Sequence, residues 1–262
     1  MIDIHHHCLP GVDDGPRDWD EAVALCQMAA ADGITTIVAT PHVLRGRWQN
    51  TSPAVLEQLA ADLRERINNS PRIILGSEVF FGHDIADIAA QGDTIIPLAG
   101  SRYVLVEFAA HAIPPLVEQP FYRLQLGGWT PVIAHPERNA VFVAKPRLLA
   151  TLVSLGAKVQ ITAGSFVGDF GPDAQRAAFE WIGKRIVHIV ASDAHNTKKR
   201  PPRMSAAFAA VQEAAGEEIA AALFQHNPQA IVDGHALQYD PEPQAVESKR
   251  GLLNRVAQFW KR

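Results

Sequence analysis

The feature that most constrains the fold is a repeated unit in which a short apolar run is followed by a helical pattern. Seven such runs cover residues 2–4, 35–39, 73–75, 103–106, 131–134, 158–161 and 187–191. Each run is short and rich in Val and Ile, which is typical of strands buried on both faces of a parallel sheet.

Helical patterns separate these runs and cover residues 18–32, 52–68, 147–155, 173–184 and 204–224, with a break near Gly216. Strands that alternate with helices predict a parallel sheet covered by helices. Seven units favour an α/β fold, a closed or nearly closed parallel barrel with helices outside, related to the eight-unit barrel but one unit short of it. The alternative is an open doubly wound sheet, but no glycine-rich dinucleotide or phosphate-loop motif favours it.

Composition limits the compartment and the partners. The formal net charge of -4 gives no reason to expect nucleic-acid binding. Cys8 and Cys26 are the two cysteines, so a disulfide framework is not expected and a reducing compartment fits. The first residues show neither the basic nor the apolar region of a signal peptide, and no apolar stretch is long enough for a membrane span. We therefore expect a cytoplasmic protein.

The sequence predicts a barrel over residues 1–239 and a different C-terminal segment over residues 240–262. Residues 240–249 are polar and proline-rich, like a linker, and residues 251–262 have apolar side chains at helical spacing with basic neighbours. We favour a short amphipathic helix that packs on the barrel or lies in solvent. The alternative is a basic contact with a membrane surface or a protein partner.

Potential metal ligands follow most of the predicted strands. These side chains are His5, His7, Asp14, His42, Glu78, Glu107, His135, Asp193 and His195. In a parallel barrel the carboxyl ends of all strands meet at one rim, where such barrels hold their active sites. We therefore expect these residues to converge.

The types of side chain indicate the kind of site. Imidazole with carboxylate, without paired thiolates, suits zinc, manganese or iron. His5 and His7 are two residues apart on a strand and so point to the same side, as do Asp193 and His195. In a single pair, the histidine could simply be a core residue that hydrogen-bonds to the backbone. Burying so many carboxylates close together would, however, cost much free energy without cations, because like charges repel and lose their hydration. The sequence therefore predicts two or three divalent ions.

Arg138 and Arg200 follow ligand positions, and a guanidinium group binds phosphate through two parallel hydrogen bonds. We predict that both bind an anion, although Arg200 beside Lys198 and Lys199 could also be a solvated surface residue. Nucleophilic alternatives lack their motifs. Neither cysteine has the arginine that a Cys-x5-Arg phosphatase needs, and residues 164–168 do not form a Gly-x-Ser-x-Gly elbow.

Together these motifs resemble the PHP superfamily (polymerase and histidinol phosphatase), and in particular its bacterial protein-tyrosine phosphatases of the capsular and exopolysaccharide systems. The matching segments are Met-Ile-Asp-Ile-His-x-His at residues 1–7, Val-Asp-Asp-Gly-Pro at 12–16, Thr-x-His at 40–42, Gly-x-Glu at 76–78, Pro-Val-Ile-Ala-His-Pro-Glu-Arg at 131–138, Ala-Ser-Asp-x-His-Asn at 191–196 and Arg-Pro-Pro at 200–202. The resemblance ends near Asp233. Two departures are His6, where the family has a smaller residue, and residues 45–50.

The resemblance implies a distorted (β/α)7 barrel and a centre of three metal ions, usually manganese, with iron or zinc as alternatives. The first ion would be held by His5, His7, Glu78 and Asp193. Glu78 would bridge to a second ion held by Glu107 and His135. The third ion would be held by Asp14, His42 and His195. Arg138 and Arg200 would bind the phosphate.

The resemblance also implies a function. The protein would remove phosphate from the tyrosine-phosphorylated tail of a bacterial autokinase of polysaccharide biosynthesis. Two alternatives stay open at this point: a small-molecule phosphatase of the histidinol-phosphatase type, and a non-catalytic regulator that binds the phosphotyrosine tail.

Overall fold

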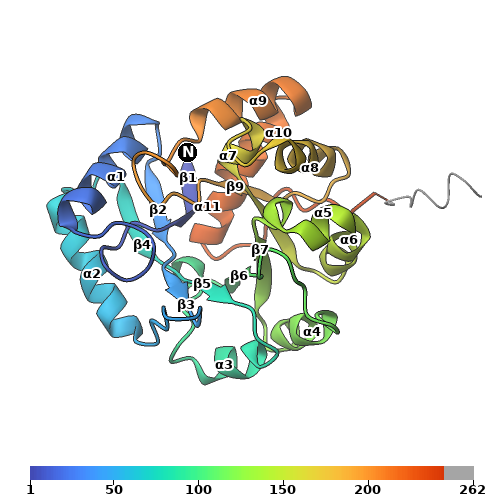
Figure 1. The fold of residues 1–262 in the computed structure, drawn as a ribbon, viewed down its shortest axis with the longest axis horizontal. Helices are drawn as coiled ribbons and strands as arrows, with labels where there is room; N and C mark the ends of the chain where they lie inside the picture. The colour runs from blue at the N-terminus through green and yellow to red at the C-terminus, as the bar shows by residue number, and fades with distance from the viewer. Residues whose placement is uncertain (245–262) are drawn as a thin grey trace, which may run out of the picture.

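The computed structural model describes residues 1–244 and shows a ring of parallel strands surrounded by helices (Figure 1). The strands are β1 (Ile2–His6), β2 (Thr36–Ala39), β3 (His42–Val43), β4 (Arg72–Leu75), β5 (Glu78–Phe80), β6 (Tyr103–Glu107), β7 (Thr130–Ala134), β8 (Lys158–Thr162) and β9 (Ile189–Ala191). All seven predicted strands are present. The short β3 and β5 were not predicted.

The five predicted helical regions are confirmed. The helices are α1 (Trp19–Ala31), α2 (Pro53–Arg66), α3 (Ile85–Gln91), α4 (Glu118–Leu126), α5 (Ala140–Ala144), α6 (Pro146–Ser154), α7 (Ala163–Phe166), α8 (Pro172–Gly183), α9 (Ser205–Ala215), α10 (Glu217–Ala221) and α11 (Asn227–Val232). Asp18 begins α1 by accepting a hydrogen bond from the Glu21 amide, as an N-cap residue does. Gly216, with a φ of 92°, separates α9 from α10 at the predicted break.

The ring closes through three irregular places. The strands pair in the orders β1-β2-β4 and β3-β5-β6-β7-β8-β9. β3 follows β2 after Pro41, and β5 follows β4 after two residues, so each short strand continues a longer one beyond a kink. Between β1 and β9, the His7 amide donates to the Ala194 carbonyl at 2.9 Å, and the Asp193 amide donates to the His5 carbonyl at 2.9 Å. The distorted parallel barrel is confirmed.

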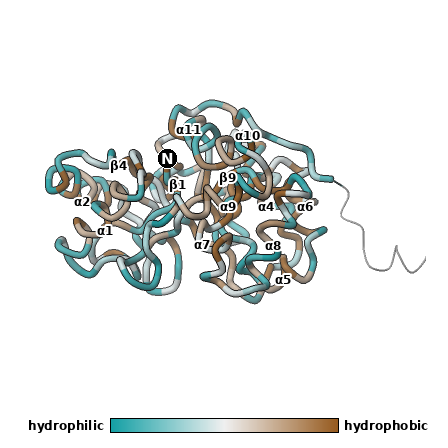
Figure 2. Tube along the Cα trace, turned by 90° about the horizontal axis from the view of Figure 1, so that it is seen from above, coloured by the Kyte–Doolittle hydropathy of each residue, from teal (hydrophilic) through white to brown (hydrophobic). Residues whose placement is uncertain are grey.

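The two ends of the barrel differ in character. Ile4, Leu105, Val132 and Ile189 fill the interior, and Ile231 of α11 closes the amino-terminal end. A larger apolar cluster packs between the strands and the outer helices. Figure 2 shows that the outer loops are largely hydrophilic. The carboxyl ends of the strands carry the polar residues.

The predicted C-terminal helix lies outside the described residues. Asp240 and Gln244 are described, and both bond to the barrel: Asp240 accepts from Lys158 Nζ at 2.5 Å, and the Gln244 amide donates to the Lys184 carbonyl at 3.0 Å. The division after residue 239 stays a prediction. Of residues 1–244, no helix has the length and apolar content needed to cross a membrane.

Candidate metal centre

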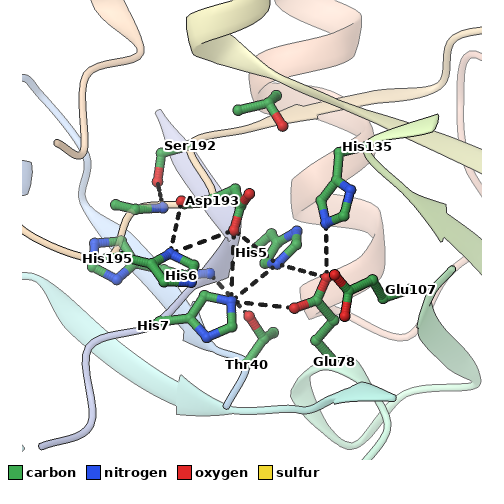
Figure 3. A network of polar contacts seen from close by, with 12 residues as sticks. His5, His6, His7, Thr40, Glu78, Glu107, His135, Ser192, Asp193 and His195 are labelled. Atoms are coloured by element: carbon green, nitrogen blue, oxygen red, sulfur yellow. Dashed lines mark hydrogen bonds and ion pairs between the residues drawn. The ribbon is translucent and has the colours of Figure 1, made fainter. Parts of the chain in front are cut away.

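The strand-end residues converge at the carboxyl rim of the barrel. In Figure 3, His5, His7, Glu78, His135 and Asp193 direct their side chains toward one another. Among the described residues, four overlapping groups have ligand atoms within 4.8 Å of one another. The groups are His5, His7 and Asp193; His5, Glu78 and His135; His42, Glu78 and Glu107; and His7, Asp14, His42 and His195. All nine predicted ligands belong to at least one group.

Glu78 lies at the middle of the cluster and is fully buried. Its Oε1 atom is 3.3 Å from His5 Nε2 and 2.9 Å from His135 Nε2. Its Oε2 atom is 3.3 Å from His7 Nε2 and 2.9 Å from His42 Nδ1. Each oxygen thus faces a different pair of imidazoles, which is the geometry of a carboxylate that bridges two positions.

Two aspartates complete the cluster on the side toward β9. Asp14 Oδ1 lies 3.2 Å from His42 Nε2 and 3.2 Å from His195 Nε2. Asp193 Oδ1 lies 3.3 Å from His5 Nε2 and 3.6 Å from His195 Nδ1. Asp14, His42 and His195 therefore meet as predicted. His7 lies in their group as well as beside His5.

The spacing of these atoms fits bound cations. Ligand bonds of about 2.1 Å place neighbouring ligand atoms roughly 3 to 3.5 Å apart, close to the separations in the cluster. Several buried ligand atoms also make no hydrogen bond within residues 1–244: His42 Nδ1, Glu78 Oε2, Asp193 Oδ1 and His195 Nε2. Unsatisfied buried polar atoms are costly, and cations would satisfy these four.

Two of the ligand candidates have unusual backbone conformations. His135 directly follows β7 with a φ of 33°, and Asp193 lies two residues beyond β9 with a φ of 53°. The left-handed region costs a non-glycine residue about 1–3 kcal/mol and is found disproportionately at functional sites. In the β1–α1 loop, a Cβ atom at Gly15 would lie 2.7 Å from the His7 carbonyl oxygen, so this close return toward β1 requires glycine.

A second layer of side chains orients the imidazoles. Asp13 Oδ2 lies 2.7 Å from His7 Nδ1 and accepts from the His42 amide at 3.1 Å. Gln160 Oε1 lies 2.9 Å from His5 Nδ1. A partner on Nδ1 fixes the tautomer that leaves Nε2 free to bind a cation. The sequence analysis did not predict this role for Asp13 or Gln160, although a glutamine inside an apolar strand run was a signal.

Charges within the cluster shift its pKa values. Burial opposes the charged form of His5, but Glu78 and Asp193 raise its pKa to about 9. Burial also opposes charging of His42, and Glu78 raises that pKa to about 10. Burial and repulsion by Glu78 raise the pKa of Glu107 to about 7. Protons on histidine therefore balance the carboxylates when no cation is present, and cation binding would release them.

Arg138 and Arg200 both donate to Asp193 Oδ2 at the edge of the cluster. Although burial opposes ionisation, Arg200, His5 and Arg138 hold the pKa of Asp193 well below its usual value. The Arg138 guanidinium also lies 4.4 Å from the centre of the Phe170 ring. The structure brings both arginines to the predicted place, and their binding of an anion stays a prediction.

A third arginine, which the sequence analysis did not select, also contacts the cluster. Arg45 Nε lies 2.7 Å from Glu107 Oε2, and its Nη1 lies 2.9 Å from His42 Nε2. His6, in contrast, is fully buried on β1 but belongs to none of the four ligand groups.

Fold and centre together define an α/β barrel with a candidate multinuclear metal site, and comparison with known proteins agrees. The profile of the family described as "Capsular polysaccharide synthesis, CpsB/CapC" matches residues 1–233. The chain therefore belongs to the CpsB/CapC family of capsular polysaccharide synthesis.

Curated relatives in this family are described as tyrosine phosphatases. The chain is 41% identical over 206 residues to the putative tyrosine-protein phosphatase CapC of Staphylococcus aureus, covering 77% of this chain and 79% of CapC. It is 35% identical to the tyrosine-protein phosphatase YwqE of Bacillus subtilis, covering 95% and 98%.

A solved structure agrees with the whole barrel. It belongs to a study of YwqE from Bacillus subtilis and CpsB from Streptococcus pneumoniae, described as unique metal-dependent tyrosine phosphatases. It matches with a TM-score of 0.90 and 35% identity, over 95% of this chain and 100% of that one.

Proposed function

We propose that this protein is a metal-dependent tyrosine phosphatase. The observation that carries the proposal is the convergence of nine imidazole and carboxylate side chains around Glu78, with unsatisfied ligand atoms at the centre. The relatives described as tyrosine phosphatases support the same reaction. The cluster lacks a cysteine among its members, so the proposed reaction does not use a thiolate nucleophile.

The cations would take three overlapping positions. The first would use His5, His7 and Asp193, with Glu78 as the bridge to the second. The second would add Glu107 and His135, and the third would use Asp14, His42 and His195. We propose Mn²⁺, with iron or zinc as alternatives, since all accept this mixture of imidazole and carboxylate. When bound, such cations lower the pKa of water and offset the charge of phosphoryl oxygens.

The arginines supply the phosphate-binding groups. Arg138 and Arg200 both contact Asp193 Oδ2, and a substrate phosphoryl group at the same edge would offer them the same kind of acceptor. There they would stabilise charge on the equatorial oxygens during in-line displacement. The leaving phenolate, with a pKa of about 10, requires less help from an acid than an alkoxide does.

We further propose that the substrate is the tyrosine-phosphorylated tail of a bacterial autokinase of polysaccharide assembly, in the cytoplasm. The family's role in capsular polysaccharide synthesis supports the pathway, and two unpaired, buried cysteines fit a reducing compartment. In this proposal residues 1–239 form the catalytic barrel. The linker and amphipathic helix predicted for residues 240–262 stay a prediction, since residues 245–262 lie outside the described residues, and nucleic acid is not a partner in this proposal.

The proposal is tested by removing and restoring the metal. Protein treated with a chelator should not hydrolyse a phosphotyrosine peptide, and added Mn²⁺ should restore turnover. Equal hydrolysis by the metal-free protein would contradict the mechanism. Rates on histidinol phosphate measured beside those on phosphotyrosine decide whether the small-molecule alternative holds, and binding without turnover would indicate the regulator.

Replacing Arg138 tests the phosphate-binding role. Arg138→Ala should lower hydrolysis of an aryl phosphate roughly 10²-fold, as loss of one donor to a charged transition state does, while metal content stays unchanged. Metal analysis and steady-state kinetics measure the two effects. Arg176→Ala, which removes an exposed arginine of α8 that pairs with Asp173 and makes no ion pair with a candidate ligand within residues 1–244, is the control and should match the wild type.

A further inference from the structure

Arg45 contacts the metal centre through the atoms that cations would use. Its Nε atom lies 2.7 Å from Glu107 Oε2, and its Nη1 atom lies 2.9 Å from His42 Nε2. Both residues belong to candidate ligand groups. His42 Nε2 also lies 3.2 Å from Asp14 Oδ1, so the nitrogen that faces Arg45 also faces the proposed third position.

Arg45 and a cation cannot share this nitrogen. A metal bond to an imidazole nitrogen uses the lone pair that points outward from the ring edge, and the Arg45 Nη1 atom, 2.9 Å from His42 Nε2, fills the position that a cation bound to this nitrogen would take. Guanidinium is also permanently charged, so it would repel a divalent ion at the same place. Contact between Arg45 and His42 Nε2 therefore excludes a cation bound to that atom.

The backbone around Arg45 forms a fixed turn. The Arg45 amide donates to the Trp48 carbonyl at 3.0 Å, and the Trp48 amide donates to the Arg45 carbonyl at 2.9 Å. The Trp48 ring stacks on His42 with centroids 5.4 Å apart, and Asn50 Nδ2 donates to the His42 carbonyl at 2.7 Å. The turn thus holds the base of the Arg45 side chain beside the cluster in whichever direction its guanidinium points.

A small cavity lies beside Arg45 and borders the ligand cluster. Its volume is about 130 Å³, several times the space that one water needs, and Arg45, Glu107, His135, Arg138 and Asn139 are among its lining residues. Two guanidinium groups therefore border one cavity beside the ligand cluster. If Arg45 left His42 and Glu107, an anion in this cavity would lie between Arg45 and Arg138.

We propose that Arg45 is a substrate-binding residue that cation loading releases. Without cations its guanidinium group balances the charge of Glu107 and occupies His42. With cations bound it turns to the cavity and binds the phosphoryl group together with Arg138. The identity of this anion rests on the proposed function, whereas the exchange with cations does not.

The exchange is tested by calorimetric titration of the metal-free protein with Mn²⁺. Arg45→Ala removes the competitor and should bind Mn²⁺ about tenfold more tightly than the wild type, the effect of one charge-assisted hydrogen bond. Arg45→Lys keeps the charge but not the fork that reaches two acceptors, so its affinity should shift in the same direction. A wild-type affinity in Arg45→Lys would reveal a long-range charge effect and overturn the exchange.

Arg47→Ala is the matched control. Arg47 lies in the same turn, with its guanidinium 4.8 Å from the centre of the Trp48 ring, and Trp48 is not a candidate ligand. Its removal deletes an equal charge, and we expect the wild-type affinity for Mn²⁺. Equal tightening in Arg47→Ala and Arg45→Ala would overturn the exchange.

Substrate binding is tested on the Mn²⁺-loaded protein with inorganic phosphate and with an aryl phosphate. Arg45→Ala should weaken phosphate binding and raise KM about tenfold with a smaller change in kcat, while Arg47→Ala should change neither. Unaltered phosphate affinity in Arg45→Ala would overturn this half of the proposal. If the wild type turned over no phosphotyrosine, the proposed function would fail, but both binding measurements would still decide the role of Arg45.

Discussion

The two ends of the barrel both bury histidine next to aspartate, but in different electrostatic settings. At the amino-terminal end, His188 Nδ1 accepts a hydrogen bond from the Val159 amide at 3.2 Å, and Nε2 lies 3.3 Å from Asp240. Asp240 is also paired with Lys158. At the carboxyl rim, four imidazoles surround the single carboxylate of Glu78, and three more carboxylates lie close by.

This difference separates a structural histidine from candidate ligands. Around Asp240 one carboxylate meets one ammonium group, and 46% of the Asp240 side chain is exposed, so its charge is balanced within the fold. At the rim, burial and repulsion by Glu78 raise the pKa of Glu107, and the carboxylates of Asp14 and Asp193 lie in the same cluster. Burial of histidine therefore does not mark a metal site by itself, whereas several carboxylates crowded around the histidines do.

The largest expected effect is at Asp193. Its side chain lies beside His5 and His195 and accepts hydrogen bonds from both Arg138 and Arg200. Asp193→Ala should lower hydrolysis of an aryl phosphate roughly 10³-fold or more, because it removes a ligand and with it several kcal/mol of charge stabilisation. Metal content should fall in parallel. Asp240→Ala is the counterpart at the other end and should keep both activity and metal. Full Mn²⁺ content in Asp193→Ala would contradict the assignment.

An intermediate effect is expected from Asp13, which contacts the cluster only through histidine. Asp13→Asn should weaken Mn²⁺ binding roughly 10- to 100-fold, the usual range for partners that orient a metal-binding histidine. Calorimetric titration measures the change. Asp173→Asn, an exposed acid of α8, is the control. An unchanged affinity would show that His7 does not need Asp13 for its orientation.

The smallest effect is expected at Asp240. A hydrogen bond with His188 and the contact with Lys158 lower the pKa of Asp240 to about 2, against an ordinary value of 3.8. A lowered pKa stabilises the fold above the ordinary value, and this contribution is lost as the pH falls toward 2. Because the side chain is nearly half exposed, Asp240→Asn should cost no more than about 1 kcal/mol at pH 7. Urea unfolding at pH 7 and pH 3 should show a smaller difference at pH 3.

The sequence predicted the strands and the convergence of the candidate ligands well because both follow short-range rules. A buried parallel strand is recognised in the sequence as a short run of Val and Ile. The residue that follows it must lie at the carboxyl rim, because all strands of a parallel barrel end there. His5, Glu78 and His135 could be chosen for this reason. β3 and β5 escaped prediction because two- or three-residue strands beyond a kink, as after Pro41, have too little length to show a pattern.

Contacts made by long side chains could not be predicted in the same way. Arg45 reaches the centre only because the turn to Trp48 folds back over His42, and nothing in the spacing of a loop fixes that direction. Gln160 was hidden in an apolar run, where its inward position depends on the register between β7 and β8. Such partners are set by tertiary packing rather than by periodicity.

The closure between β1 and β9 has a consequence for how the barrel opens. His5 and His7 come from one side of this junction, and Asp193 and His195 come from the other. Backbone hydrogen bonds join the two sides, and the Asp3 carboxylate accepts hydrogen bonds from the amide and hydroxyl of Ser192. In the proposed loaded state, cations would clamp the first residues of the chain to a segment that is synthesised almost two hundred residues later. Hydrogen exchange of the His7 and Asp193 amides would then slow sharply when cations bind. Cation binding would thus suppress local opening of the barrel at this junction.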